Sequence, residues 1–536
     1  MSDLLIHNAQ LRSMDPACPR AEWVLIRGGV IVALGDGAPP GAAEKIDAGG
    51  RLVLPGFQDA HVHLLSGGLD LATAASLYEV LTGAGLLAAV AAHAARRPEL
   101  PLLIGAGWAP GPFGNHNLNA ALIDPVTGDR PAVLYDSSFH NACLNSAALR
   151  MAGIGDDTPD PPNGHIVRDT AGRATGMLHE EAIPWAVERL PGFSDAQWLE
   201  GLLAGQAHAN AHGITGVLDP KITAQEHRIY RRALDEGRLT LRVAGAAAVT
   251  EADTPESAVA RLTAMRAEAP GPEYHLHSAK FFMDGVFENR TAALKAPYAD
   301  APGSNAPCMF GKDQTEALFT ALDAARFAIH VHVVGDAAAA RALDGLEAAR
   351  AANGYWPAAH QLAHLQLVAP EDFARLATAG ATANIQPLWA RLDPLVPDIA
   401  LDSIGAARRP CTYAFRRMLE AGADWSLSSD WPVSTLNPFE IIETAVTRQA
   451  RRADGAREPF LPEEALTVQE CVLGYTAQAA AACWRGGFTG RLRPGFSADL
   501  VVLDQDVFAC APHEIGNTKV LLTLFKGRAV YRPGPV

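Results

Sequence analysis

Eight short apolar segments in the middle of the chain, each ending in polar residues or glycine, constrain the fold more than any other feature. Stretches rich in Ala, Leu, Glu and Arg separate them, a pattern typical of strands that alternate with helices. Such strands pair in parallel through right-handed crossovers, and eight of these units close a (β/α)8 barrel. The predicted barrel strands are residues 52–61, 213–219, 239–248, 276–284, 328–334, 361–367, 380–386 and 423–429.

The first two barrel segments lie too far apart for a single crossover helix to join them. The residues between them carry strand and turn signals of their own, including Pro131–Tyr135 and a stretch rich in Pro, Asp and Gly at Asp156–Gly164. Loops on the active-site face of a barrel tolerate such growth. We therefore expect a barrel domain of residues 56–487 in which roughly residues 66–195 form an insertion over the mouth.

Both ends of the chain carry short β-like runs. Leu4–Ile6 and Trp23–Ile26 lie near the N-terminus, and Asp499–Leu503 and Val520–Leu524 lie near the C-terminus, with glycine-containing turns among them. The matching signals predict one composite β domain, a small β-sandwich built from residues 1–55 and 488–536. The expected fold class is therefore α/β, a TIM-like (β/α)8 barrel with a small β-sandwich domain from both termini and an insertion after the first barrel strand.

Composition excludes several classes of function. A net charge of −15 argues against a nucleic-acid or anionic-membrane partner. The N-terminus lacks the features of a signal peptide, and no apolar run approaches the roughly 18 residues of a membrane span. The seven cysteines are scattered without a CxxC pair, which fits neither a disulfide framework nor a thiolate zinc site. We expect a cytoplasmic protein in which His and carboxylate groups hold any metal.

Residues able to bind a metal stand at the carboxyl ends of several predicted strands. His61 and His63 follow the first strand and share one face of it, because residues i and i+2 of a strand point the same way. An HxH pair alone is weak evidence, and the pair at His275 and His277 lies on the face opposite Lys280, so we assign that pair to structure. The position of His61 and His63 strengthens the case that they bind a metal, since barrel active sites are built where the strands end. Further polar residues at strand ends are Lys280, Asp284, His332, His364 and Asp430.

Together these motifs resemble the amidohydrolase superfamily, and within it the YtcJ-like branch of amidohydrolase family 3, which includes N-substituted formamide deformylases. The resemblance extends over nearly the whole chain, with the motifs in the expected order. The matching stretches are Leu54–His63, Lys280–Gly285, Arg290–Ala293, His332–Asp336, His364 with Gln366, Gln386–Pro387, Ser429–Val433 and Ala498–Val502.

The resemblance implies a divalent-metal site, for which we expect Zn²⁺ and one or two ions per chain. The implied ligands are His61, His63, Lys280, His332, His364 and Asp430. Lys280 would be a carboxylated bridge in a two-metal site, and an ion pair with Asp284 is the structural alternative. Neutral imidazoles suit zinc-like ions, and Asp430 would be the general acid/base that moves the proton of metal-activated water to the leaving nitrogen.

His140, in the run Ser138–Asn141 of the insertion, resembles a family histidine and is a second catalytic candidate, placed to polarise the scissile carbonyl. A surface-loop histidine is the alternative interpretation. His208 and His212 stand four apart without the Glu of an HExxH motif, and we assign them to structure. The residues expected to contact substrate are Trp108, Phe113, Asp284, Arg290, Gln386, Trp389 and Trp431.

These observations favour a metal-dependent hydrolase of an amide C–N bond in a small organic substrate, such as an N-substituted formamide or an acylated amine. A deaminase or cyclic amidohydrolase on the same scaffold is one alternative. It is disfavoured because Gly335 and Asp336 follow His332, where deaminases generally carry a helper Glu. A non-catalytic binding scaffold is the other, and it is disfavoured because every expected ligand position is filled. The oligomeric state stays open, with a homodimer among the options.

Overall fold

The computed structural model describes residues 3–78, 80–108, 117–392, 399–451 and 458–534, and its centre is a parallel barrel. Eight strands follow one another in the sheet in the reverse of their order in the chain, so each is paired with its sequence neighbour. The barrel strands are β6 (Phe57–Asp59), β13 (Ile214–Ile222), β14 (Arg242–Ala248), β15 (Tyr274–Phe282), β16 (Ala328–Val333), β17 (His360–His364), β18 (Ala381–Ile385) and β19 (Asp424–Leu427). All eight coincide with segments predicted from the sequence.

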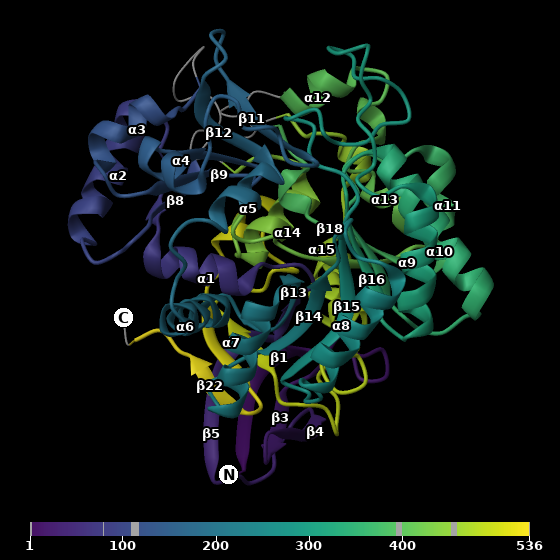
Figure 1. Ribbon diagram of the computed structural model, residues 1–536. Coiled ribbons are helices and arrows are strands. Elements are labelled where there is room, and N and C mark those ends of the chain that lie inside the picture. Colours follow the sequence, from purple (N-terminus) through teal and green to yellow (C-terminus); the bar gives the residue numbers. More distant parts are fainter. Residues whose placement is uncertain (1–2, 79, 109–116, 393–398, 452–457, 535–536) are drawn as a thin grey trace.

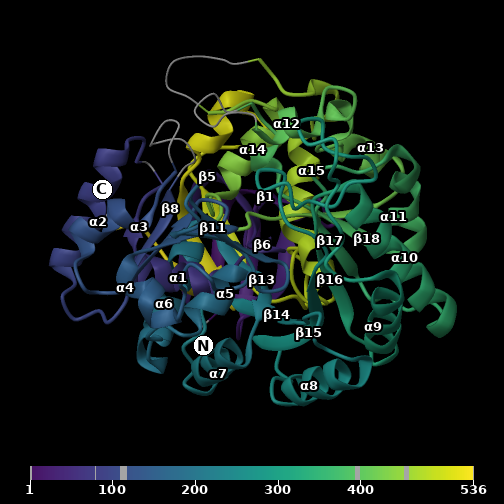
Figure 2. The ribbon, with the colours of Figure 1, turned by 45° about the horizontal axis from the view of Figure 1, so that its top comes forward.

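The barrel strands form because both of their faces are buried. Residues of β16, β17 and β18 are buried without exception, which matches the continuous apolar runs typical of parallel sheets covered by helices. Figure 2 shows helices α8 to α11 along the outside of strands β15 to β18. The helices that follow successive strands are α7 (Ala224–Asp235), α8 (Pro255–Ala267), α9 (Lys312–Ala324), α10 (Asp336–Asn353), α11 (Phe373–Ala379), α12 (Ile399–Ile404), α13 (Phe415–Glu420), α14 (Pro438–Thr447), α15 (Val468–Leu473) and α16 (Ala479–Ala482).

The first and last barrel strands approach each other at their carboxyl ends. The Asp430 backbone N–H donates to the His61 carbonyl at 2.9 Å, and the Ser429 N–H lies 3.2 Å from both carboxylate oxygens of Asp59. Two segments far apart in the chain are thereby fixed side by side at the mouth of the barrel.

The two ends of the chain meet in one eight-stranded sheet. The strands lie in the order β22-β21-β20-β5-β1-β3-β4, and β2 pairs with β1. Apolar residues of both ends share one core cluster, in which Ile6 and Val53 pack with Leu500 and Leu524. The sheet is tied to the barrel by the buried ion pair between Arg242 and Asp499. Its strands are β1 (Leu4–Arg12), β2 (Arg20–Ala21), β3 (Trp23–Arg27), β4 (Val30–Gly35), β5 (Glu44–Pro55), β20 (Leu500–Leu503), β21 (Val520–Phe525) and β22 (Arg528–Tyr531).

The residues between β6 and β13 form a second compact unit with a six-stranded sheet, in the order β11-β12-β10-β9-β8-β7. In Figure 1 this insertion lies at the upper left, and the sheet of the two termini lies at the bottom. Its strands are β7 (Ala75–Ser76), β8 (Leu103–Trp108), β9 (Ala132–Asp136), β10 (Asn141–Leu144), β11 (Gly164–Arg168) and β12 (Ala174–Glu180). Its helices are α1 (Leu64–Thr73), α2 (Gly83–Arg96), α3 (Ala120–Thr127), α4 (Ser146–Ala152), α5 (Ala182–Val187) and α6 (Asp195–Ala211).

Helix α1 begins directly after His63 and packs closely on α6. A Cβ added to Gly68 would lie 2.1 Å from the Gly201 carbonyl oxygen, and one added to Gly205 would lie 2.7 Å from the Leu64 carbonyl oxygen. Only glycines allow these two backbones to come so near, and the contact fixes the start of α1 beside the first histidine pair. Within the part of the chain that the structure describes, no helix combines the length and apolarity needed to cross a membrane.

Candidate metal centre and its surroundings

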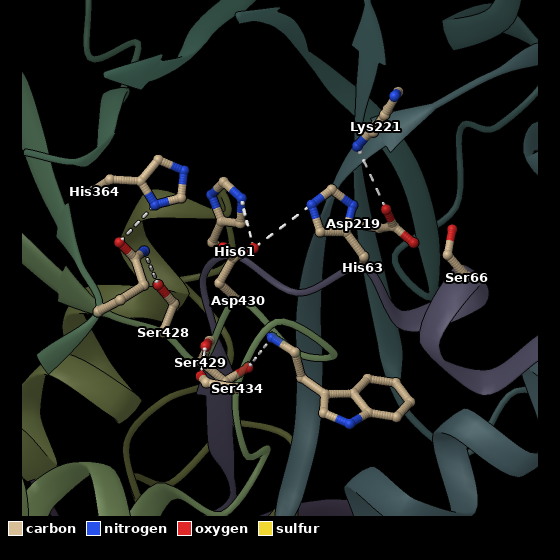
Figure 3. A network of polar contacts seen from close by, with 12 residues as sticks. His61, His63, Ser66, Asp219, Lys221, His364, Ser428, Ser429, Asp430 and Ser434 are labelled. Carbon is tan, nitrogen blue, oxygen red and sulfur yellow. Dashed lines mark hydrogen bonds and ion pairs between the residues drawn. The ribbon is translucent and has the colours of Figure 1, made fainter. Parts of the chain in front are cut away.

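Four histidines, a lysine and an aspartate meet at the carboxyl end of the barrel. His61 and His63 follow β6, while Lys280 lies near the end of β15. His332 and His364 lie at the ends of β16 and β17, and Asp430 follows β19. Because the carboxyl ends of parallel strands open on the same edge, residues hundreds of positions apart converge there. Figure 3 shows Asp430 next to both His61 and His63, with His364 beside them.

The imidazoles and the carboxylate form one contiguous cluster. Asp430 Oδ1 lies 3.4 Å from His61 Nε2 and 3.6 Å from His63 Nε2. One ligand atom from each of these three residues lies within 4.8 Å of the others. The His364 ring centroid lies 5.0 Å from that of His61 and 4.5 Å from that of His332. The structure therefore brings together all four histidines that the sequence predicts as ligands.

Burial keeps these imidazoles neutral. It lowers the pKa of His63 to about 3, with the charge of Lys280 adding to the effect. The pKa values of His61, His332 and His364 also fall well below their ordinary value, again chiefly through burial. A neutral imidazole keeps a lone pair on one nitrogen, which is the form that binds a metal.

Lys280 and Asp430 are buried ionisable groups with unpartnered atoms. Among the described residues, Lys280 Nζ has no hydrogen-bond acceptor and Asp430 Oδ1 has no donor. Burial lowers the pKa of Lys280 to about 7 and raises that of Asp430 to about 7. The attraction between the two charges opposes both shifts but is the smaller effect. Buried charges are costly unless they are paired or coordinate a metal. Neutral imidazole nitrogens with a free carboxylate oxygen fit a zinc-like divalent ion.

The rings are also held from behind. His61 Nδ1 lies 2.9 Å from His330 Nε2, and His332 Nδ1 lies 3.5 Å from Asp284 Oδ1. Polar groups behind a metal-binding imidazole fix its orientation and its tautomer. The sequence reasoning assigned no role to His330. Its i, i+2 spacing from His332 was the available signal, because both side chains then point into the barrel.

His140 reaches the cluster from the insertion. Its ring centroid lies 5.5 Å from that of His332, and its Nδ1 lies 2.6 Å from Glu180 Oε2. The other oxygen of Glu180 accepts hydrogen bonds from Thr291 Oγ1 at 2.6 Å and Asn289 Nδ2 at 3.2 Å. A carboxylate with three partners is firmly positioned, so the His140 ring is held in turn. The surface-loop interpretation does not describe this partly buried, hydrogen-bonded arrangement.

The charge of His140 follows from that contact. Burial alone lowers its pKa, but the charge and hydrogen bond of Glu180 outweigh burial and raise the pKa to about 9. Burial would raise the pKa of Glu180, yet His140 and its other hydrogen bonds bring it below the ordinary value. At neutral pH the pair is therefore an imidazolium beside a carboxylate. Sequence reasoning missed Glu180, which lies 40 residues from His140 and approaches it through the antiparallel pairing of β10 with β12.

Asp284, predicted to contact substrate, is fully buried and bonded to the backbone. Its Oδ1 accepts the Val334 N–H at 3.0 Å, and its Oδ2 accepts the Gly335 and Ala293 N–H groups at 2.8 and 2.9 Å. These bonds anchor the loops that follow β15 and β16. No ion pair between Asp284 and Lys280 is found among the described residues, so the structural alternative for Lys280 lacks its proposed contact.

Two further predicted substrate contacts also have partners within the protein. Arg290 forms an ion pair with Asp300 and donates from Nη1 to the Glu288 carbonyl at 3.0 Å. Gln386 is buried, and its Oε1 lies 3.0 Å from Nδ1 of His364. Both residues therefore organise the surroundings of the site rather than present free polar groups to it.

The predicted aromatic contacts differ in position. Trp389 stacks on the His364 ring, with centroids 5.4 Å apart and an interplanar angle of 21°. Trp108 is buried in the core of the insertion, where its indole N–H donates to a backbone carbonyl. Trp431 is buried against helices α1 and α6. Phe113 lies outside the described residues. Of the aromatics expected to contact substrate, Trp389 is thus the one seen beside a predicted ligand.

The histidine pairs assigned to structure contact each other or other side chains. The ring centroids of His275 and His277 lie 5.0 Å apart, and His277 packs on Trp484 at 4.7 Å. His208 and His212 lie 4.7 Å apart on α6 and its C-terminal cap, and His212 Nδ1 lies 2.9 Å from the His208 carbonyl oxygen.

Comparison with known proteins agrees with this geometry. The sequence model of the amidohydrolase family matches residues 44–531. The chain is 27% identical to the amidohydrolase-like protein YtcJ of Bacillus subtilis and 28% identical to an N-substituted formamide deformylase of Arthrobacter pascens, over 98% of both chains in each case. An uncharacterised metal-dependent hydrolase from Pyrococcus horikoshii shares the fold, with a TM-score of 0.76 and 20% identity over 95% of this chain and 99% of that one.

Proposed function

The chain belongs to the amidohydrolase family and is a hydrolase that acts on carbon–nitrogen bonds, and from this premise we propose that it uses a divalent metal to cleave an N-substituted formamide or a related acylated amine. One observation carries the proposal. Four neutral imidazoles converge with an unpartnered lysine amine and an unpartnered carboxylate oxygen at the mouth of the barrel. The full-length similarity to a formamide deformylase supports the substrate class.

We infer that His61, His63, His332, His364 and Asp430 hold the metal, and that the ion is Zn²⁺. A divalent ion bound there would polarise the substrate carbonyl and make water reactive near neutral pH. The neutral state of the imidazoles and the absence of a partner at Asp430 Oδ1 support this ligand set.

Lys280 decides between one ion and two. Its buried amine has no hydrogen-bond acceptor among the described residues, so a cation there is offset by the charge of Asp430 and by the face of the Phe282 ring, 4.5 Å away, but not by a direct hydrogen bond. Carboxylation of Nζ by carbon dioxide would turn it into an anionic bridging ligand. We propose this state for an enzyme loaded with two ions.

The proton transfers follow from the positions of Asp430 and His140. The Asp430 carboxylate takes a proton from the attacking water and delivers it to the leaving nitrogen, so that amine and acid separate as products. His140, held by Glu180, donates a hydrogen bond to the substrate carbonyl oxygen as negative charge develops on it. A fixed, charged donor stabilises that oxygen more in the transition state than in the ground state.

The domain division completes the proposal. A composite β domain of residues 1–55 and 488–536 would support the barrel of residues 56–487, with roughly residues 66–195 as the insertion that brings His140 to the mouth. The shared core of the two termini supports this division. Whether the composite sheet is one layer of a sandwich stays a prediction.

The proposed activity is tested with purified, metal-analysed protein and a set of N-substituted formamides and longer acyl amines. We expect release of formate and free amine, with formamides turned over faster than the longer acyl amines. A His61→Ala, His63→Ala double variant should lose metal and activity, whereas His165→Gln, which changes an exposed histidine of the insertion, should keep both. Metal-loaded protein that hydrolyses none of these amides would refute the substrate class.

A further inference from the structure

Four buried polar side chains form a hydrogen-bonded chain that leads from His364 into the barrel interior. Gln386 Oε1 lies 3.0 Å from His364 Nδ1, and Gln386 Nε2 lies 2.7 Å from Ser428 Oγ and 3.0 Å from Asn384 Oδ1. Asn384 Nδ2 then donates to Gln361 Oε1 at 2.8 Å. All four are at most 1% exposed, so water does not compete for these bonds. Figure 3 shows His364 and Ser428 within this network.

Two backbone carbonyls fix the direction of every bond in the chain. Gln361 Nε2 donates to the Ala482 carbonyl at 3.1 Å, and Asn384 Nδ2 donates to the Ala60 carbonyl at 2.9 Å. A carbonyl oxygen can only accept, so the nitrogen of each amide must face it. The oxygens of both amides therefore point the other way, and Asn384 Oδ1 faces Gln386.

The same logic reaches His364. Asn384 Oδ1 is an acceptor, so the group of Gln386 that faces it must be the NH₂, whose second hydrogen goes to Ser428 Oγ. Gln386 Oε1 is thereby turned toward His364 Nδ1. Since an amide oxygen only accepts, Nδ1 must carry the ring proton. Nε2 is left with the lone pair.

We propose that Gln386 is a positioning residue that holds His364 in the Nδ1–H tautomer and so leaves Nε2 as its metal-binding atom. The inference rests on the proposed function for the identity of what Nε2 binds, but the tautomer itself follows from the hydrogen bonds. Trp389, stacked on the same ring, restricts its tilt. Without the amide oxygen the ring could protonate at Nε2, and that atom would then have no lone pair to offer.

Removing an outer partner of a metal-binding histidine typically costs about 10- to 100-fold in metal affinity. Gln386→Met keeps the length of the side chain and removes the acceptor, so it should weaken binding of Zn²⁺ by that factor. Ser428→Ala should keep the tautomer, because Asn384 Oδ1 still accepts from the Gln386 amide. Gln206→Met is the matched control: Gln206 is a buried amide on α6 that bonds to the backbone of Arg238 and Thr240. Its loss should leave the affinity for Zn²⁺ unchanged.

The decisive measurement is the ¹⁵N spectrum of histidine-labelled protein stripped of metal, with the His364 signals assigned through a His364→Gln variant. We expect the Nδ1–H tautomer in the wild type and in Ser428→Ala, and its loss in Gln386→Met. Chelator competition then gives the affinity for Zn²⁺ of each variant. An Nε2–H signal in the wild type, or the wild-type tautomer in Gln386→Met, would overturn the inference. A wild type that shows Nδ1–H but binds no divalent metal would instead refute the proposed function and leave the positioning role intact.

Discussion

Replacing Asp430 by Asn should remove the proton-transfer function of this residue without disturbing the fold. Asp430 has a backbone φ of 54°, in the left-handed region that Asn and Asp tolerate better than other residues with a Cβ. Its backbone bond to the His61 carbonyl survives the change, and Oδ1 has no hydrogen bond to lose among the described residues. The Asn variant should therefore fold and unfold like the wild type when both are free of metal.

The expected loss of rate is large because the amide cannot accept the water's proton. Loss of a positioned acid/base typically lowers the rate by about 10²- to 10⁴-fold, which corresponds to roughly 3 to 5 kcal/mol in the barrier. Because the imidazole ligands remain, the variant should keep at least one metal. The effect should appear in kcat, while KM changes little.

Steady-state kinetics, metal analysis and thermal unfolding together decide the matter. The matched control is Asp424→Asn, the same exchange at the exposed start of the same strand β19, which should leave kcat unchanged. An Asp430→Asn enzyme within a few-fold of the wild-type kcat would remove Asp430 from the proton-transfer role. A variant that has lost all metal would show that its main contribution is as a ligand.

Four further outcomes are expected. Treatment with a strong chelator should abolish activity and lower the melting temperature, and added Zn²⁺ should restore both; an unchanged melting curve would count against a bound metal. Lys280→Ala should lose one metal and most activity, as measured by metal analysis and kcat, and an unaltered metal content and rate would leave Lys280 with a structural role only. Glu180→Gln removes the partner that raises the pKa of His140 to about 9. A group whose pKa is raised on folding adds its full contribution to the free energy of unfolding below its unfolded pKa of 6.5, and that contribution is lost as pH rises through 9. The difference in unfolding free energy between wild type and variant, measured by urea titration, should therefore become smaller from pH 6 to pH 10. A difference that does not change with pH would contradict the pairing. Arg242→Met leaves the buried carboxylate of Asp499 without its cation and should cost about 3 to 5 kcal/mol of unfolding free energy, whereas a loss below 1 kcal/mol would show that other contacts hold the terminal sheet.

The barrel was predictable because its signals are local. Each strand is an apolar run bounded by polar residues, and the ligands stand where those runs end. For example, His332 ends the apolar run of β16, and Lys280 lies on the inward face of β15. Periodicity and position therefore placed the eight strands and put candidate ligands at their carboxyl ends, and the family resemblance implied which histidines bind the metal.

The contacts that the sequence did not reveal depend on pairings between distant segments. His330 meets His61 across 269 residues, and Glu180 meets His140 through the antiparallel pairing of β10 with β12, which are not consecutive strands. Polar side chains at strand ends also look alike in a sequence whether they face substrate or protein. Asp284 was expected to bind substrate, yet three backbone N–H groups surround its carboxylate.

Two of the aromatic residues predicted to contact substrate lie in packed core, and a similar reason explains why the sequence did not reveal this. Trp108 and Trp431 stand close to predicted site residues in the chain, but both side chains are buried in packed interiors. Whether a side chain near the site is buried depends on helices from other parts of the chain. Helices α1 and α6 cover Trp431 in this way. The local sequence around a residue does not show which distant helix packs on its side chain.

Strand β5 leads through a single residue, Gly56, into β6 and the first histidine pair. In the terminal sheet β5 lies between β1 and β20. Val501 and Val502 of β20 pair with Leu54 and Val53 of β5. On the ribosome, β5 emerges before any of the barrel, whereas β20 emerges after all of it. The edge of β5 must therefore stay open during nearly all of synthesis, and an open edge invites pairing with other chains. A chaperone that binds the open edge of β5 would protect the nascent chain from aggregation until its last strands leave the exit tunnel. Stalling translation shortly before residue 500 should therefore produce aggregation-prone chains.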